Sequence, residues 1–596
     1  MILLRRLSLL ALAALAWAPR AQARPIAWNP WSDEVFARAR REHKFVLLDL
    51  EAVWCHWCHV MDATTYQDPR VAALLGSRYL AVRVDQDSRP DLASRYEDYG
   101  WPATIIYGPD GTEIVKKQGY VEPAGMARLL QAVIDDPSPV DYHDGGAFAA
   151  AGTRAAAPAA ERVAVLRRQW LGGYDDKAGG WGFDHKFLDW DNVEFALRAA
   201  AQGDERATRM ARDTLRLQRK LLDPVWGGMY QYSVDGDWNE PHFEKIMPMQ
   251  AEDLRIYALA YAQWGDPADL ATARAIHRFL HDFLRGPDGA FFVSQDADLV
   301  PGEHSADYFA LDDAGRRARG IPRVDPHRYA RENGWAIAGL AQFAAVTGEP
   351  EARAEAETAA RWVIAHRALP GGGFRHDERD AAGPYLGDTL AMGRAFLGLY
   401  QLTADAAWLA RAEAAAGFIR IHFARGAEPG FASSDTTRPS FPAPRPEFDE
   451  NVGLARFAAA LAGASGRADD RGMAPVALRW LLAPGVGEPR HAYVGGVLLA
   501  EDEARTDPLH VAVVGPKDDA SARALYAAAL RVPTAHKLVE WWDRREGPAP
   551  RGEAIYPDLD QAAAFVCANG ACSAPLLAEA RLTARLRKIL AEPPAS

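Results

Sequence analysis

The sequence of 596 residues is long enough for several domains, and its 49% hydrophobic content allows large buried cores. With 80 Asp and Glu against 68 Lys and Arg, the formal net charge is −12 at pH 7. This acidic balance, without any long basic tract, excludes a general nucleic-acid binder, and the lack of glycine-rich phosphate-binding fingerprints leaves a nucleotide cofactor unsupported.

The amino terminus has the pattern of a secretory signal peptide. Arg5 and Arg6 precede an apolar run over 7–18, and Ala21-Gln22-Ala23 offers a small-x-small cleavage site. We therefore predict a signal peptide over 1–23 and a periplasmic or secreted protein, with no stable membrane anchor after cleavage. The residues around the two arginines depart from the twin-arginine pattern, which favours the general export route.

Residues 24–136 predict an alternation of strands and helices. The pattern favours strands over 45–50, 79–85, 105–107 and 113–118, and helices over 31–43, 61–75, 92–99 and 123–134. Between the first strand and the helix over 61–75 lies Val53-Trp54-Cys55-His56-Trp57-Cys58-His59, which holds two of the four cysteines. The positive end of a helix dipole stabilises the thiolate of a cysteine at such a junction, and the thiolate is the species that attacks disulfides.

Cys55 is therefore the candidate nucleophile and Cys58 the residue that resolves a mixed disulfide, and we expect the sulfur of Cys55 to be exposed. His56 is a candidate for stabilising the thiolate. Three other interpretations remain open: attachment of a c-type haem through Cys55-x-x-Cys58-His59, a metal site of cysteines and histidines, and an inert structural disulfide. The strand and helix around the pair explain it without haem or metal, so no cofactor and no metal are predicted.

Residues from about 31 to 134 resemble a thioredoxin fold. The resemblance rests on the Cys-x-x-Cys pair, on Trp54 before it, on Asp49 six residues before Cys55, and on Gly100-Trp101-Pro102 ahead of the strand over 105–107. It implies that Pro102 is a cis-proline beside the cysteines and that Asp49 is the buried acid that takes the proton of the resolving cysteine. Trp54 and Trp101 are then candidate substrate contacts, and the implied partner is a disulfide-bearing protein client or a thiol reductant.

A linker over 137–160, rich in Pro, Ala and Gly, leads to a long helical region over 161–484. Loops that combine glycine with an aromatic residue separate its helices, as in Gly179-Gly180-Trp181 and Gly289-Ala290-Phe291. Such recurring helical hairpins predict a stacked repeat architecture. We predict helices near 161–171, 190–201, 204–222, 246–264, 267–285, 328–347, 350–368, 386–403, 405–424, 447–464 and 468–482.

This region resembles the (α/α) six-hairpin toroid of many glycosidases and N-acylglucosamine epimerases. Together with the thioredoxin-like domain, it resembles the spermatogenesis-associated thioredoxin-domain family, whose members carry the Trp-Cys-His-Trp-Cys-His motif found here at 54–59. Further matching positions are Lys186-Phe187, Pro241-His242-Phe243-Glu244-Lys245, Gln295-Asp296-Ala297-Asp298 and Asn333-Gly334. In one departure, Met247-Pro248-Met249-Gln250 stands where the family usually has a Tyr-Asp-Asn triplet, so this chain lacks that acid and amide.

The loops at one end of a toroid build a funnel in which sugar sites combine aromatic platforms with carboxylates. His242 and Glu244 are the strongest candidate pair because they share one short segment; two acids would suit glycoside hydrolysis, and two histidines an epimerisation. The structural alternative is that loop acids cap helices and that aromatic residues beside glycines plug the toroid. The candidate glycan contacts are His185, His242, Glu244, Asp296, Asp298 and Asn333.

Residues 485–596 predict a small α/β module, with strands over 509–515 and 536–542 and a helix over 519–530. Cys567 and Cys572 flank the turn residues Asn569-Gly570. A local disulfide is the simpler interpretation of this second pair, and a relay that exchanges electrons with Cys55 and Cys58 is the alternative.

The sequence thus predicts a multidomain α+β protein with a thioredoxin-like α/β domain over 24–136, a six-hairpin toroid over 161–484 and a small C-terminal α/β module over 485–596. The function that we expect is that of an exported thiol–disulfide oxidoreductase with a glycan-binding or glycan-processing toroid. The alternatives are a carbohydrate-active enzyme with an ancillary thioredoxin domain and a non-catalytic glycan-binding factor.

Overall fold

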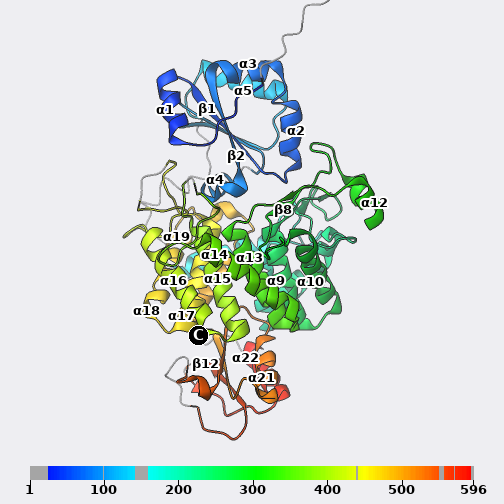
Figure 1. Cartoon of the computed structure of the whole chain (residues 1–596), viewed down its shortest axis with the longest axis vertical. Coiled ribbons are helices and arrows are strands. Elements are labelled where there is room, and N and C mark those ends of the chain that lie inside the picture. The colour runs from blue at the N-terminus through cyan, green and yellow to red at the C-terminus, as the bar shows by residue number, and fades with distance from the viewer. Residues whose placement is uncertain are drawn as a thin grey trace, which may run out of the picture. The chain divides into compact units, whose positions relative to one another are not determined.

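The computed structural model describes residues 25–97, 100–140, 159–380, 382–437, 441–549, 556–568 and 571–591 (Figure 1). The predicted signal peptide and most of the predicted linker lie outside these residues. Contacts divide the chain into two compact units, of which the first comprises Met1–Ala52, Trp57–Asp85 and Asp98–Asp141. The second comprises Val53–His56, Gln86–Glu97 and Tyr142–Ser596. Among the described residues, no helix is long and apolar enough to cross a membrane.

The first unit is built on a four-stranded sheet in the order β2-β1-β3-β4. β1 (Phe45–Glu51) pairs in parallel with β2 (Tyr79–Asp85) and antiparallel with β3 (Ala103–Tyr107), which pairs antiparallel with β4 (Glu113–Gln118). One face of the sheet packs against α2 (His56–Thr64), α3 (Pro69–Arg78) and α5 (Pro123–Asp135), because Leu47, Met61, Leu75 and Leu130 share one buried cluster. On the other face, Phe36 of α1 (Asp33–Glu42) packs edge-on against Tyr107. The predicted thioredoxin-like fold is confirmed.

The helix predicted over 61–75 is wrong in its bounds. α2 begins at His56 and ends at Thr64, and α3 begins at Pro69. Proline has no amide hydrogen to donate within a helix and is favoured in the first turn, and the carboxylate of Asp68 accepts the amide hydrogens of Arg70 and Val71. The chain therefore starts a new helix at this point.

The second unit contains a closed ring of six inner helices. Each inner helix contacts the next in the order α7, α9, α13, α15, α17 and α20, and α20 contacts α7 again. Six outer helices pack mainly against the inner helix at the same place in this order: α8, α10, α14, α16, α19 and α6. This is the predicted six-hairpin toroid. The inner helices are α7 (Trp190–Ala201), α9 (Met247–Trp264), α13 (Ala330–Thr347), α15 (Leu386–Thr403), α17 (Phe448–Ser465) and α20 (Gly495–Arg505); the outer ones are α8 (Glu205–Gln218), α10 (Pro267–Phe279), α14 (Pro350–Arg367), α16 (Ala406–His422), α19 (Met473–Leu481) and α6 (Ala159–Gly172).

The ring extends beyond the boundary at residue 484 that the sequence indicated. α20 fills the sixth inner position, since it packs against α7, α17 and α6. Its paired glycines fit closely against the neighbouring helices: a Cβ at Gly495 would lie 2.6 Å from Asn192 Oδ1, and one at Gly496 would lie 2.7 Å from Val452 Cγ1. Glycines at this contact let the helices that close the ring approach each other.

Side-chain amides of the inner helices hold the glycine-aromatic loops in place. In each case the amide oxygen accepts the backbone N–H of a loop residue, and the amide nitrogen donates to the carbonyl of that same residue. Gly227 in one of these loops has φ +75°, and a Cβ there would lie 2.1 Å from the carbonyl oxygen of Ala275. The clamping pairs are Gln250 with Met229, Asn333 with Phe291, and Asn451 with Phe431.

An ion network joins inner helices at the level of Arg255 and Arg456. Arg255 lies 2.7 Å from Glu194 and 2.5 Å from Glu252, and Arg456 lies 3.0 Å from Glu503 and also contacts Glu194. None of these five side chains is more than 11% exposed. The network therefore links α7, α9, α17 and α20 across the ring.

The C-terminal module repeats the sheet topology of the first unit. β10 (Leu509–Val514) pairs in parallel with β11 (Lys537–Trp542) and antiparallel with β12 (Ala563–Ala568), which pairs antiparallel with β13 (Ala571–Cys572). α21 (Ala520–Leu530) connects β10 to β11, and α22 (Glu579–Ala591) follows β13. The predicted small α/β module is thus a second sheet of thioredoxin-like order, with no cysteine in the β10–α21 loop over 515–519.

Candidate redox site

The two cysteines of the Cys-x-x-Cys segment lie at the start of α2. Cys55 immediately precedes the helix, and Cys58 is its third residue. Both are disulfide-bonded, no free cysteine is present, and the other pair is Cys567–Cys572, so Cys55 and Cys58 are bonded to each other. The positive end of the α2 dipole would stabilise a thiolate on Cys55 once the disulfide is reduced.

The expectation that Cys55 is exposed is wrong. Cys55 is 4% exposed and Cys58 is 2% exposed. Within the second unit, the backbone N–H of Ala297 donates to the carbonyl of Trp54 at 3.4 Å, which covers the segment before Cys55. Thiol exchange with a protein client would therefore require this segment to move.

Trp54 is buried against an acid that follows β2. Its indole Nε1–H donates to Asp87 Oδ2 at 2.7 Å, and Trp54 is 3% exposed. Burial and the nearby Glu332 raise the pKa of Asp87 to about 7, against the opposing effects of Arg331 and the Trp54 hydrogen bond. The sequence predicted Trp54 as a substrate contact, and the structure directs its polar edge to the protein itself.

His56 contacts an acid from the loop that was predicted to serve a glycan. His56 Nδ1 lies 2.7 Å from Asp298 Oδ1, and the Asp298 side chain is 1% exposed. Asp298 also accepts the N–H of Gly302 at 2.7 Å, and its own N–H donates to Asp296 Oδ1 at 2.9 Å. These contacts fix the carboxylate of Asp298, and the carboxylate fixes the orientation of the His56 ring.

His376 ties the Asp87 loop to the inner helices. Its Nε2 lies 2.6 Å from the carbonyl oxygen of Asp87, and its Nδ1 lies 2.8 Å from Asp388 Oδ1 at the start of α15. Burial alone would lower the pKa of His376, but the carboxylate of Asp388 outweighs it and raises this pKa to about 9. The imidazolium then donates both of its N–H groups, one to each oxygen.

Asp49 lies on β1 as predicted, within a cluster centred on Arg83. Arg83 contacts Asp49 at 2.9 Å and Glu51 at 3.2 Å, and it also pairs with Asp62. Burial raises the pKa of Asp49 to about 6, although Arg83 opposes this, and burial together with Asp49 raises that of Glu51 to about 8. Oxygens of the three acids lie close enough to bind one ion, but the guanidinium of Arg83 already meets their charge. An acid that titrates near neutral pH suits proton transfer in thiol exchange.

The Trp101–Pro102 peptide bond is cis, as the thioredoxin resemblance implied. Pro102 is buried directly before β3, and Trp101 is half-buried. The strand order places β3 next to β1, so this loop leads into the strand that neighbours the one before the cysteine segment. The roles of Pro102 and Trp101 toward a substrate stay predictions.

Of the predicted glycan contacts, the structure brings His185, His242 and Glu244 together. His242 stacks on Tyr232 at 4.3 Å between ring centroids, and His185 packs edge-on against the same ring at 5.3 Å. Glu244 Oε1 lies 3.9 Å from His242 Nδ1, and Glu244 Oε2 is buried without a hydrogen-bond partner. Asp298 contacts His56 instead, Asp296 accepts the N–H of Asp298, and the amide of Asn333 is occupied by the backbone of Phe291.

The sequence reasoning missed Asp87, His376 and His304. The His304 ring lies 5.9 Å from that of His56 and 6.1 Å from that of Phe243, so it stands between the Asp298 contact and the Glu244 segment. One signal for Asp87 was available: parallel strands end at the same edge of a sheet, so residues after β1 and β2 come together. No pattern in the sequence around His376 or His304 indicates that either residue lies at this site.

Comparison with known proteins covers both regions. A family profile described as Thioredox_DsbH, a protein of unknown function (DUF255), matches residues 10–135. Spermatogenesis-associated protein 20 of Homo sapiens is 28% identical over 310 residues, which cover 46% of this chain and 39% of the human protein. The similarity that the motifs indicated is confirmed, and the match spans about two fifths of that relative's length.

Two further proteins are each similar to a part of this chain. Thiol:disulfide interchange protein DsbD 2 of Pseudomonas aeruginosa is 39% identical over 105 residues, 17% of this chain and 18% of that protein. Among solved structures, a D-mannose isomerase superposes with a TM-score of 0.44 at 11% identity, covering 58% of this chain and 97% of that one.

Proposed function

We propose that the protein is a thiol–disulfide oxidoreductase whose redox centre is Cys55–Cys58. The observation that carries the proposal is a disulfide at the amino end of α2, in a sheet of thioredoxin-like order with a cis-proline before β3. The similarity of one region to a thiol:disulfide interchange protein supports it. The Cys55 thiolate would attack a client disulfide, and Cys58 would then displace the client from the mixed disulfide.

In this mechanism the chain's own polar groups manage charge and protons. Asp298 holds the His56 ring next to the nucleophile, so that the ring can stabilise the thiolate. Asp49, with its pKa raised to about 6 by burial, takes the proton of Cys58. The direction of electron flow depends on the thiolate, since a more stable thiolate makes the disulfide more oxidising.

The test is to trap the mixed disulfide with Cys58→Ser in the full chain and to identify the client by mass spectrometry. The matched control, Cys55→Ser, should trap nothing, because it lacks the nucleophile. The redox potential should lie above the roughly −270 mV of thioredoxin, and Asp298→Asn should shift it toward more reducing values. Equal trapping by both cysteine variants, or no trapping by either, would contradict the proposal.

A second candidate function is glycan binding at Tyr232, His242 and Glu244. A half-buried aromatic stack next to a carboxylate with one unpartnered buried oxygen is the kind of surface that recognises sugar hydroxyls. Titration of the protein with a panel of oligosaccharides, followed by calorimetry, should give binding that Glu244→Gln and Tyr232→Ala abolish. Catalysis on the glycan is a separate proposal, which turnover assays on the same panel would test.

We also propose export to the periplasm or secretion, from the pattern of residues 1–23. A disulfide at Cys55–Cys58 would persist in such a compartment. Fractionation of a bacterial host and mass determination of the mature amino terminus should find a chain that starts at Arg24. A full-length chain confined to the cytoplasm would contradict export.

A further inference from the structure

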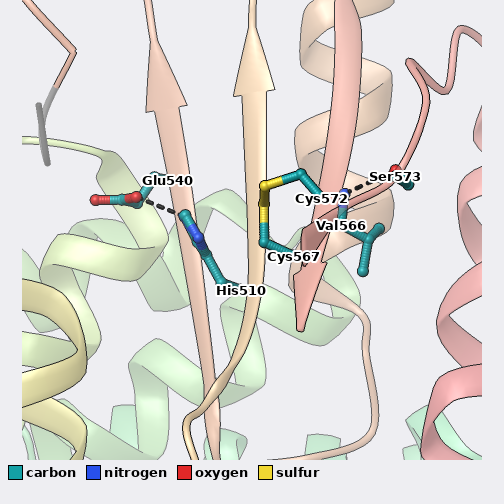
Figure 2. The surroundings of a disulfide bond; sticks show 6 residues. All are labelled: His510, Glu540, Val566, Cys567, Cys572 and Ser573. Carbon is teal, nitrogen blue, oxygen red and sulfur yellow. Dashed lines mark hydrogen bonds and ion pairs between the residues drawn. A yellow bond between two sulfur atoms is a disulfide. The ribbon is translucent and has the colours of Figure 1, made fainter. Parts of the chain in front are cut away.

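The second disulfide, Cys567–Cys572, belongs to a row of four reactive side chains across the C-terminal sheet. In the antiparallel register, Cys572 on β13 stands opposite Cys567 on β12, and Cys567 stands opposite His510 on β10. Glu540 on β11 faces Ala512, two residues beyond His510, so the side chains share one face of the sheet. Figure 2 shows His510 between Glu540 and the disulfide.

The acid and the imidazole of this row are joined. His510 Nε2 lies 2.6 Å from Glu540 Oε2, and the hydroxyl of Tyr400 donates to Glu540 Oε1 at 3.2 Å. The side chains of His510 and Glu540 are 11% and 5% exposed. Directly opposed residues of an antiparallel pair have Cβ atoms about 4.5–5.5 Å apart, so His510 and Cys567 are cross-strand neighbours on this face of the sheet.

The other sulfur is accessible. Cys572 is exposed and lies on the two-residue edge strand β13. Cys572 and Ser573 line a cavity of about 500 Å3, together with Arg505 and Arg585. Acids, among them Asp502 and Asp507, line the cavity as well, and its size admits a low-molecular-weight thiol.

We propose that Cys567–Cys572 is a second redox-active disulfide, which accepts electrons from low-molecular-weight thiols and in which the His510–Glu540 pair supplies a proton to Cys567. The proposal is independent of the Cys55–Cys58 centre. The β10–α21 loop, which corresponds in topology to the Cys-x-x-Cys loop, holds no cysteine, and the cysteines of this module lie on β12 and β13.

The exchange proceeds in two steps. A thiolate RS⁻ attacks the sulfur of Cys572, the Cys567–Cys572 bond breaks, and Cys567 leaves with the electron pair and takes a proton from His510. A second thiolate attacks the RS sulfur of the mixed disulfide and releases Cys572 as a thiolate, which takes a proton from solvent. Two thiols have become one disulfide, and two electrons have reduced the protein.

The test uses the full chain with Cys55→Ser and Cys58→Ser, so that only the second disulfide remains. Its reduction by dithiothreitol is followed from pH 6 to 9 by acid quench, alkylation and mass spectrometry, with circular dichroism as the check that the protein stays folded. We expect reduction of the folded protein, and His510→Gln should slow it at least about tenfold at low pH and make its rise with pH steeper, because the thiolate fraction still increases with pH while the proton donor is gone. His536→Gln is the matched control, because His536 lines the same cavity but lies outside the row.

Glutathione identifies the attacked sulfur. In the same background, oxidised glutathione should form a stable mixed disulfide with Cys572 of Cys567→Ser and release one glutathione thiol, and it should form far less with Cys567 of Cys572→Ser. Glu540→Gln is the second variant if His510→Gln fails to fold, and it should slow reduction by dithiothreitol in the same direction. A disulfide that stays oxidised until the protein unfolds, equal rates in the two histidine variants, or preferential attack at Cys567 would each overturn the proposal.

Discussion

His376 is a buried side chain whose charge depends on two oxygens. Burial favours the neutral ring, and the Asp388 carboxylate, 2.8 Å away, favours the charged one. The carboxylate prevails, and the resulting imidazolium can also donate to the carbonyl of Asp87. The hold of the inner helices on this loop therefore depends on a proton.

Stability of the second unit should fall as the pH rises from about 6.5 to 9. The pKa of His376 is raised to about 9 in the folded protein, against roughly 6.5 when unfolded, so its stabilisation is complete below 6.5 and lost as the pH passes 9. The shift corresponds to on the order of 3 kcal/mol. Urea unfolding at several pH values should show this loss, and His376→Gln should remove most of the difference between pH 6 and 9. An unchanged pH slope in the variant would contradict the assignment.

Arg83 should be essential to the first unit. Arg83→Met would leave the buried carboxylate of Asp49 without its cation, and removing one partner of a buried ion pair costs about 3–5 kcal/mol. Hydrogen exchange of β1 amides, with denaturant titration, measures the loss. Arg78→Met on exposed α3 is the control and should be nearly neutral. A small effect of Arg83→Met would show that the acids are protonated in the folded protein.

From the sequence we could identify site residues that lie close to one another along the chain. The place of Cys55 between a strand and a helix followed from the pattern, and the places of Trp54, Asp49 and Pro102 followed from the resemblance to a thioredoxin fold. Asp298 was expected in a sugar funnel because nothing in its own segment indicates that His56, 242 residues away, lies against it. Long-range contacts of this kind have no periodic signature.

At the scale of elements, Asn333 holds the loop at Phe291 in place, so its main role is structural. Asn333→Ala removes two hydrogen bonds to Phe291 and leaves a buried N–H and a buried carbonyl unpaired, which costs about 1–3 kcal/mol each. We expect faster hydrogen exchange over 289–292 and a lower unfolding midpoint, without any glycan present. Asn239→Ala, at an exposed turn, is the control. Unchanged stability combined with lost glycan binding would instead favour the substrate role that the sequence predicted.

The long helices of the toroid were predictable, and its last inner helix was not. α13 and α15 carry strong apolar patterns between clear breaks, so their bounds agree with the prediction to within two residues. α20 begins with two glycines, which have low helix propensity, and it lies beyond the predicted end of the toroid at residue 484, so no helix was predicted there. Packing against α7 and α17 stabilises this helix, and helix propensity, which is a local property, does not reflect such tertiary contacts.

At the scale of the whole molecule, ring closure depends on the network around Arg456. Arg456→Met would leave Glu194, Glu503 and Asp191 without a shared cation, and we expect a loss of about 3–5 kcal/mol. Thermal unfolding followed by far-UV circular dichroism measures it, and Arg411→Met on the outer helix α16 is the exposed control. Because the ring closes through α20, the variant should also increase proteolysis between α19 and α20. A variant as stable as the control would rule out this role.

Two short pieces, Val53–His56 and Gln86–Glu97, are counted with the helical unit although the chain on either side of them belongs to the thioredoxin-like one. A biochemist who excises residues 25–140 to study the cysteines in isolation would carry away Trp54, His56 and Asp87 and leave their counterparts Asp298 and His376 behind. Reactivity measured on such a fragment would be that of the Cys-x-x-Cys segment without these contacts, and it would differ from the reactivity in the full chain.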